Sequence, residues 1–215
     1  MNVLILGCSF GVPGNGCPEQ YHTENQLKDL GHTVYNFSIR GAGNLETLDS
    51  GIKFIETNPN FKVDWLVWFH TELIRDNEEL GKKTSKYYSL DYLSKLVYNE
   101  YAKFIRTLNC KIAVIGGAAP IYPNFFDYIT PDFCIPSWFN EILNLELPQI
   151  QTLSKPEAVA AAQGIGSWDK LKVLERHEEI LNALEASEDF PDNYHAGMRP
   201  HIELSKRLHR VMSGG

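Results

Sequence analysis

The chain has 215 residues, of which 43% are hydrophobic and 22% charged, the balance of a globular protein with a full hydrophobic core. Its formal net charge of −7 gives no electrostatic basis for binding nucleic acid or an anionic membrane. No pair among its four cysteines has the spacing of a metal site, so we expect free thiols in a reducing compartment.

The N-terminal residues predict a strand rather than a targeting signal. Residues 1–7 lack the basic stretch, long apolar region and cleavage site of a signal peptide. No apolar run approaches the length of a membrane-spanning helix. We therefore expect a cytoplasmic protein with no membrane partner.

The first half of the chain alternates between strand and helix patterns. Short apolar runs predict strands, and apolar residues at helical spacing predict helices, with Asn44 as the cap of the second helix. The expected strands are 3–7, 33–38, 65–69 and 111–115, and the expected helices are 19–30, 44–57 and 89–108. This alternation favours a three-layer α/β/α sandwich around a mostly parallel sheet, with the carboxyl ends of all strands at one edge.

The second half is less regular. Prolines and aromatic residues are frequent between 118 and 150, and we interpret about 118–170 as an insertion into a single domain of residues 1–215. The insertion either packs through its own aromatic residues or forms a lid or substrate wall. Helical patterns return over 171–184 and 200–212.

Ser9 is the first candidate for chemistry. It lies in Gly7-Cys8-Ser9-Phe10-Gly11, directly after the first predicted strand. Open α/β sheets bind their ligands at the carboxyl ends of their strands, and a serine hydroxyl there becomes a nucleophile if a base is delivered to it. The alternative is that Ser9 only caps the following helix.

Asp192 and His195 supply such a base. An acid three residues before a histidine can bind one ring nitrogen and leave the other to accept a proton from a serine. The pattern alone is weak, because an Asx turn beside an exposed histidine gives the same residues. Its co-occurrence with Ser9 favours a Ser-His-Asp triad. Of the other histidines, we expect His201 and His209 at the surface or in packing, and we identify no partners for His22 and His32.

At this point the chain resembles the SGNH hydrolases, the GDSL-type esterases and lipases. Gly7-Cys8-Ser9 matches the Gly-Asp-Ser motif of the nucleophile, with Cys8 in place of the aspartate. Residues 36–41 resemble the second block, whose glycine donates its backbone N–H to the oxyanion, and Gly41 is the matching residue. Asn44 follows closely and is expected to line the same pocket.

The third and fourth blocks match unequally. The family's third block, Gly-x-Asn-Asp, corresponds to residues 68–72, which contain no asparagine, so His70 or Thr71 would have to donate to the oxyanion instead. Losing such a donor costs about 10²–10³ in rate. Asp192-x-x-His195 matches the family's acid–base pair, although Ala196 stands where the family commonly has proline.

The resemblance implies a flavodoxin-like SGNH hydrolase fold and a serine esterase that needs no metal or organic cofactor. The implied substrates are small acyl esters, including acetyl groups on carbohydrate. Two alternatives stay open: acyl transfer to a sugar hydroxyl by the same triad, and a non-catalytic binding or structural module that keeps the fold. The sequence leaves the oligomeric state undetermined.

Overall fold

The computed structural model describes residues 1–14, 16–117, 121–138, 141 and 196–214. Five parallel strands form one sheet in the order β2-β1-β3-β4-β5. The strands are β1 (Asn2–Gly7), β2 (Thr33–Asn36), β3 (Trp65–His70), β4 (Lys111–Gly116) and β5 (Phe133–Ile135). The chain runs from β1 to one side for β2 and then to the other side for β3, as in flavodoxin-like sheets.

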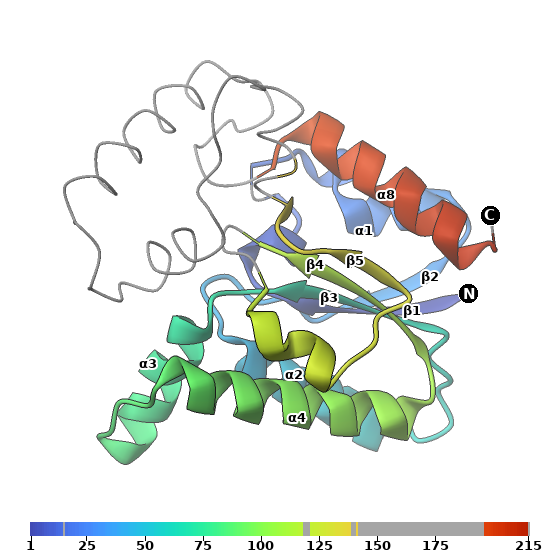
Figure 1. The fold of residues 1–215 in the computed structure, drawn as a ribbon. Helices are drawn as coiled ribbons and strands as arrows, with labels where there is room; N and C mark the ends of the chain where they lie inside the picture. Colours follow the sequence, from blue (N-terminus) through green and yellow to red (C-terminus); the bar gives the residue numbers. More distant parts are fainter. Residues whose placement is uncertain (15, 118–120, 139–140, 142–195, 215) are drawn as a thin grey trace, which may run out of the picture.

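Helices cover both faces of the sheet, so the predicted three-layer α/β/α sandwich is confirmed (Figure 1). One side, the α8 face, is covered by α1 (Thr23–Asp29) and α8 (Met198–Met212). The other side, the α4 face, is covered by α2 (Asn44–Thr57), α3 (Leu73–Thr84) and α4 (Leu90–Leu108). Three short 3₁₀ helices complete the described elements: η1 (Ser9–Gly11), η2 (Glu19–Tyr21) and η3 (Pro123–Asp127).

The apolar strands supply a core on each face because successive side chains of a strand point to opposite sides. In β1, Val3 and Ile5 lie in the core under α8, whereas Leu4 and Leu6 lie in the core over α4. A strand buried on both faces needs an unbroken apolar run, which is the pattern that predicted β1.

The predicted helix boundaries hold for some elements and change for others. Residues 44–57 are helical as predicted, but Gly43 is the N-cap of α2, so the prediction that Asn44 caps this helix is wrong. The pattern over 19–30 is divided into η2 and α1, with His22 between them. α3 was not predicted from the sequence because most of its residues are polar.

Part of the proposed insertion belongs to the main fold. Residues 133–135 form β5, the edge strand next to β4. Phe125 is fully buried, and its ring centre lies 6.0 Å from that of Trp68. The ring centres of Trp138 and Phe10 are 6.1 Å apart. Phe125 and Trp138 therefore pack on opposite faces of the sheet, whereas Phe126 is exposed. The predicted helix over 171–184 lies outside the described residues.

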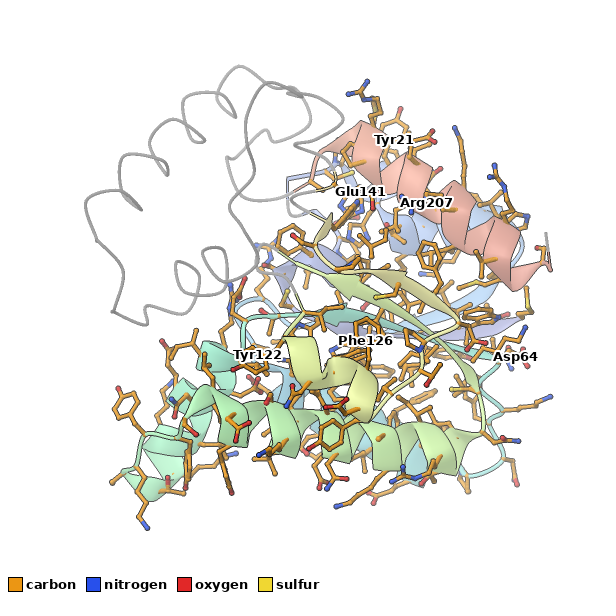
Figure 2. The ribbon with its side chains drawn as sticks, viewed as in Figure 1. Tyr21, Asp64, Tyr122, Phe126, Glu141 and Arg207 are labelled. Carbon is orange, nitrogen blue, oxygen red and sulfur yellow. The ribbon has the colours of Figure 1, made fainter. Side chains whose placement is uncertain are left out.

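Arg207 ties α8 to the β5 edge of the sheet. Figure 2 shows the Arg207 side chain pointing toward Glu141, with which it forms an ion pair. Its guanidinium also lies 5.3 Å from the centre of the Phe133 ring. These contacts fix one side of α8, the helix that begins shortly after the Asp192–His195 motif.

The four cysteines all lie in described parts of the chain, and none of them forms a disulfide. None of the helices in these same parts combines the length and apolar character needed to cross a bilayer.

Candidate active site

Ser9 lies at the carboxyl end of β1, where η1 begins. The turn is closed by hydrogen bonds from the Gly11 N–H to the Cys8 carbonyl (2.9 Å) and from the Val12 N–H to the Ser9 carbonyl (3.3 Å). Cys8, not Ser9, occupies the N-cap position, so the alternative role of Ser9 as a helix cap is not what the structure shows. Ser9 is 9% exposed and therefore nearly covered.

Two glycines allow the Ser9 turn to press against neighbouring strands. A Cβ on Gly7 would lie 2.5 Å from the Cβ of Phe69 in β3, and a Cβ on Gly11 would collide with the Ser38 hydroxyl beyond β2. The turn therefore sits between the ends of β2 and β3. This is the point where the strand order reverses, the usual ligand site of an open α/β sheet.

The loop that carries Gly41 is fastened to the same turn. Asn36 donates from Nδ2 to the Gly11 carbonyl (2.7 Å), and the Ile39 N–H donates to the Gly7 carbonyl (2.9 Å). Gly41 itself has a φ of 73° and open space around its α-carbon. Its exposed, left-handed backbone is the conformation that glycine adopts most easily. The structure thus brings the Ser9 turn and the loop of Gly41 together.

Asn44 has a different position from the one expected. Its Nδ2 donates to the Thr71 carbonyl (3.1 Å) and to Asp76 Oδ2 (2.8 Å). Its Oδ1 accepts from the Thr71 N–H (3.0 Å) and from Trp68 Nε1 (3.2 Å). The side chain is 1% exposed, so it joins α2 to the end of β3 and has no N–H left for an oxyanion.

The hydrogen-bond donors of Thr71 are also used within the protein. Its N–H binds Asn44, and its hydroxyl donates to Glu72 Oε2 (2.8 Å). Arg75 pairs with the same Glu72 oxygen at 2.8 Å. Thr71 is buried, so neither of its donors faces the solvent-accessible end of the sheet.

His70 packs into the core on the α4 face rather than toward the substrate side that the sequence suggested. Its Nε2 lies 3.2 Å from the Tyr98 hydroxyl, and its ring lies 5.1 Å from that of Trp68. Burial lowers the pKa of His70 to about 3, so the ring is neutral at physiological pH.

Cys8 is buried directly beneath the Ser9 turn. Burial raises the pKa of its thiol, and the nearby Glu72 carboxylate raises it further. The thiol is therefore protonated and unreactive at neutral pH. An aspartate at this position, as in the Gly-Asp-Ser motif, would place a second carboxylate beside Glu72.

Asp192 and His195 lie outside the described residues. Ala196, the residue after His195, is fully buried in the same core cluster as Cys8 and Phe10, the two neighbours of Ser9. Ala196 thus packs on the α8 face of the sheet, the same face as Cys8 and Phe10.

No known protein family matches the chain, and no curated protein matches it. Among solved structures, the psychrotrophic esterase EstA from Pseudoalteromonas sp., inhibited by monoethylphosphonate, is similar over 99% of this chain and 97% of its own, with a TM-score of 0.52 and 11% identity. The chain shares its fold with this esterase. A catalytic mutant of an acetylxylan esterase from Geobacillus stearothermophilus aligns over 98% of this chain and 93% of its own, with a TM-score of 0.44 and 13% identity.

Two contacts between histidines were not predicted from the sequence, His22 with His201 and His32 with His209. His22 is fully buried beside the Ser9 turn, and His201 is buried in the first turns of α8. His32 and His209 also pair, with 2.9 Å between His32 Nε2 and His209 Nδ1. All these partners are far apart in sequence, so no local pattern reveals them. Within the described residues, no group of three or more potential ligands could hold a metal ion.

Proposed function

We propose that the protein is a serine esterase that cleaves small acyl esters, including acetyl esters on carbohydrate. Ser9 is the nucleophile, His195 the base and Asp192 the residue that orients His195. The shared fold with a solved esterase supports ester hydrolysis as the class of reaction. The acyl group and its position on carbohydrate rest on the resemblance to SGNH hydrolases alone.

The burial of Ala196 is the observation that carries the proposal. Ala196 shares a core cluster with Cys8 and Phe10 on either side of Ser9. Ala196 directly follows His195 in the sequence, so the base of the proposed triad is next in the chain to a residue of this cluster. A histidine next to this residue in the sequence supports the role of Ser9 as a nucleophile, because serine needs a neighbouring base to react.

In the proposed reaction, His195 takes the proton of the Ser9 hydroxyl while Ser9 Oγ attacks the ester carbonyl carbon. The carbonyl π electrons move to oxygen, and the backbone N–H groups of Ser9 and Gly41 bind the resulting oxyanion. The carbon–alcohol bond then breaks, and the alcohol leaves with the proton from His195. Water, deprotonated by His195, attacks the acyl-serine, and the carboxylic acid and free Ser9 are released.

The proposed oxyanion site has two backbone donors, the N–H groups of Ser9 and Gly41, and lacks the third donor that the asparagine of the family's third block would supply. Asn44 and Thr71 use their donors within the protein, and His70 faces the α4 core. Since one missing donor costs about 10²–10³ in rate, we expect slower turnover than in an esterase with a complete third block.

The proposal is tested by labelling the folded protein with a fluorophosphonate and by measuring hydrolysis of p-nitrophenyl acetate. We expect labelling at Ser9, and a loss of about 10³-fold or more in kcat for Ser9→Ala and His195→Ala. Ser50→Ala, in the middle of α2, serves as the control and should keep wild-type turnover.

Unlabelled wild-type protein, or Ser9→Ala with wild-type turnover, would refute the nucleophile role. The engagement of Asn44 and Thr71 favours the non-catalytic module as the second candidate in that case. Added sugar alcohols distinguish acyl transfer from hydrolysis, because a transferase would form sugar esters in place of free acid.

A further inference from the structure

His22 is buried between η2 and α1, where it makes two directed hydrogen bonds. Its Nδ1 accepts from the Glu24 N–H at 3.3 Å and so caps the start of α1. Its Nε2 lies 3.3 Å from the carbonyl oxygen of Phe10, inside the turn that carries Ser9.

These two bonds define the tautomer of His22. A backbone N–H can donate only to an unprotonated ring nitrogen, so the proton sits on Nε2 and is donated to the Phe10 carbonyl. Burial lowers the pKa of His22 to about 4, which keeps the ring neutral and the tautomer fixed at physiological pH.

The Phe10 and Gly11 carbonyls are thus bound by side chains from two different elements. His22 holds the Phe10 carbonyl from the start of α1, and Asn36 holds the Gly11 carbonyl from the end of β2 at 2.7 Å. A 3₁₀ helix as short as η1 has few internal hydrogen bonds, so contacts of this kind determine its orientation.

His22 also connects the turn to α8. Its ring centre lies 4.3 Å from that of His201, which accepts from the Thr23 N–H through Nδ1 at 3.4 Å. The Thr23 hydroxyl lies 2.8 Å from the same nitrogen. His201 is near the beginning of α8, the helix that follows His195 in the chain.

We propose that His22 is a positioning residue for Ser9: its Nε2–H bond to the Phe10 carbonyl holds η1 in the orientation that presents the Ser9 hydroxyl and N–H to substrate. This inference rests on the proposed esterase function. It assigns to His22 a role beyond capping α1, because a cap needs only the Nδ1 acceptor.

Two variants separate the two bonds of His22. In His22→Gln the amide NH₂ reaches toward the place of Nε2 and can still donate to the Phe10 carbonyl. In His22→Asn the amide oxygen takes the place of Nδ1 and can cap α1, where asparagine is a favoured residue, but the side chain is too short to reach Phe10. If His22 positions the Ser9 turn, His22→Gln should preserve activity. If His22 only caps α1, His22→Asn should preserve it.

We expect His22→Asn to lose about 10- to 100-fold in kcat and in the rate of fluorophosphonate labelling, with little change in KM, because small misplacements of reacting groups are costly. His22→Gln should stay within about threefold of wild type. Amide hydrogen exchange over residues 9–12 should be faster in His22→Asn than in His22→Gln, with α4 as the internal control.

Wild-type labelling and exchange in His22→Asn would overturn the inference, as would equal losses in both variants. Failure of the reagent to label wild-type protein would instead refute the nucleophile role of Ser9. Hydrogen exchange would then still decide whether His22 holds η1, because it does not depend on activity.

Discussion

The Asp76 carboxylate and the Asn44 amide bind each other in the interior, with 2.8 Å between Asp76 Oδ2 and Asn44 Nδ2. The other oxygen of Asp76 accepts from the Leu45 N–H at 2.8 Å, so this buried acid satisfies a free donor in the first turn of α2. The pair joins α3 to the start of α2, just beyond the loop of Gly41.

Asp76→Ala should lower the free energy of unfolding by about 2–4 kcal/mol, because it leaves the Asn44 and Leu45 donors buried without their acceptor. Urea denaturation followed by circular dichroism measures the change. Asp91→Ala is the matched control: its partner Lys95 is exposed, and an exposed pair contributes little to stability. Similar losses in both variants would contradict the role of Asp76.

Cys8→Asp should destabilise the protein by about 3 kcal/mol at pH 7, since a carboxylate would be buried beside Glu72. Burial and the neighbouring charge raise the pKa of the new acid in the folded state. Its destabilising effect should therefore grow as pH rises and shrink as pH falls. The double variant with Glu72→Gln should recover part of the loss, and Cys8→Ser provides the control of similar size. No recovery in the double variant would contradict repulsion between the two acids.

Acid should weaken the fold through its buried histidines. Burial lowers the pKa of His22 to about 4 and of His70 to about 3, so the unfolded chain binds protons that the folded protein excludes. The stability from these two groups is complete above pH ~6.5, the ordinary histidine pKa, and is lost as pH falls toward the folded values. Urea denaturation at pH 7, 6, 5 and 4.5 should show a smaller decrease for His22→Gln than for wild type. An identical pH dependence would contradict the buried neutral state of His22.

Gly7→Ala should cost more than about 3 kcal/mol, because its Cβ would meet backbone and Cβ atoms of Phe69 that cannot move aside. Gly31→Ala tests the separate effect of backbone strain, since Gly31 has a φ of 87° but no atom within 4 Å of the place that a new methyl group would take. That variant should lose only about 1–2 kcal/mol. Thermal denaturation of both variants compares the steric clash at Gly7 with the backbone strain at Gly31. Equal losses of stability in the two variants would contradict the clash between residue 7 and Phe69.

β1, β3 and β4 could be predicted because an unbroken apolar run is what a strand buried on both faces requires. The site could be predicted only in part. The approach of the Gly41 loop to Ser9 follows from parallel strands ending at one edge, but the role of Asn44 depends on Asp76, an acid in a helix with a mostly polar sequence. The hydrogen bond from His22 to the Phe10 carbonyl likewise joins two turns, and no hydrophobic periodicity in the sequence predicts such a contact. The three residues of β5 are too few to show an alternation.

The position of α8 has a consequence for synthesis on the ribosome. Ile5 and Val67 belong to the core cluster that Leu204 and Leu208 complete from α8. Translation delivers the strands of the sheet before this covering helix. Until α8 emerges, the nascent chain therefore presents part of its future core to water. A chain that stops before α8 would leave apolar core residues such as Ile5 and Val67 only partly covered, a species that chaperones and proteases recognise.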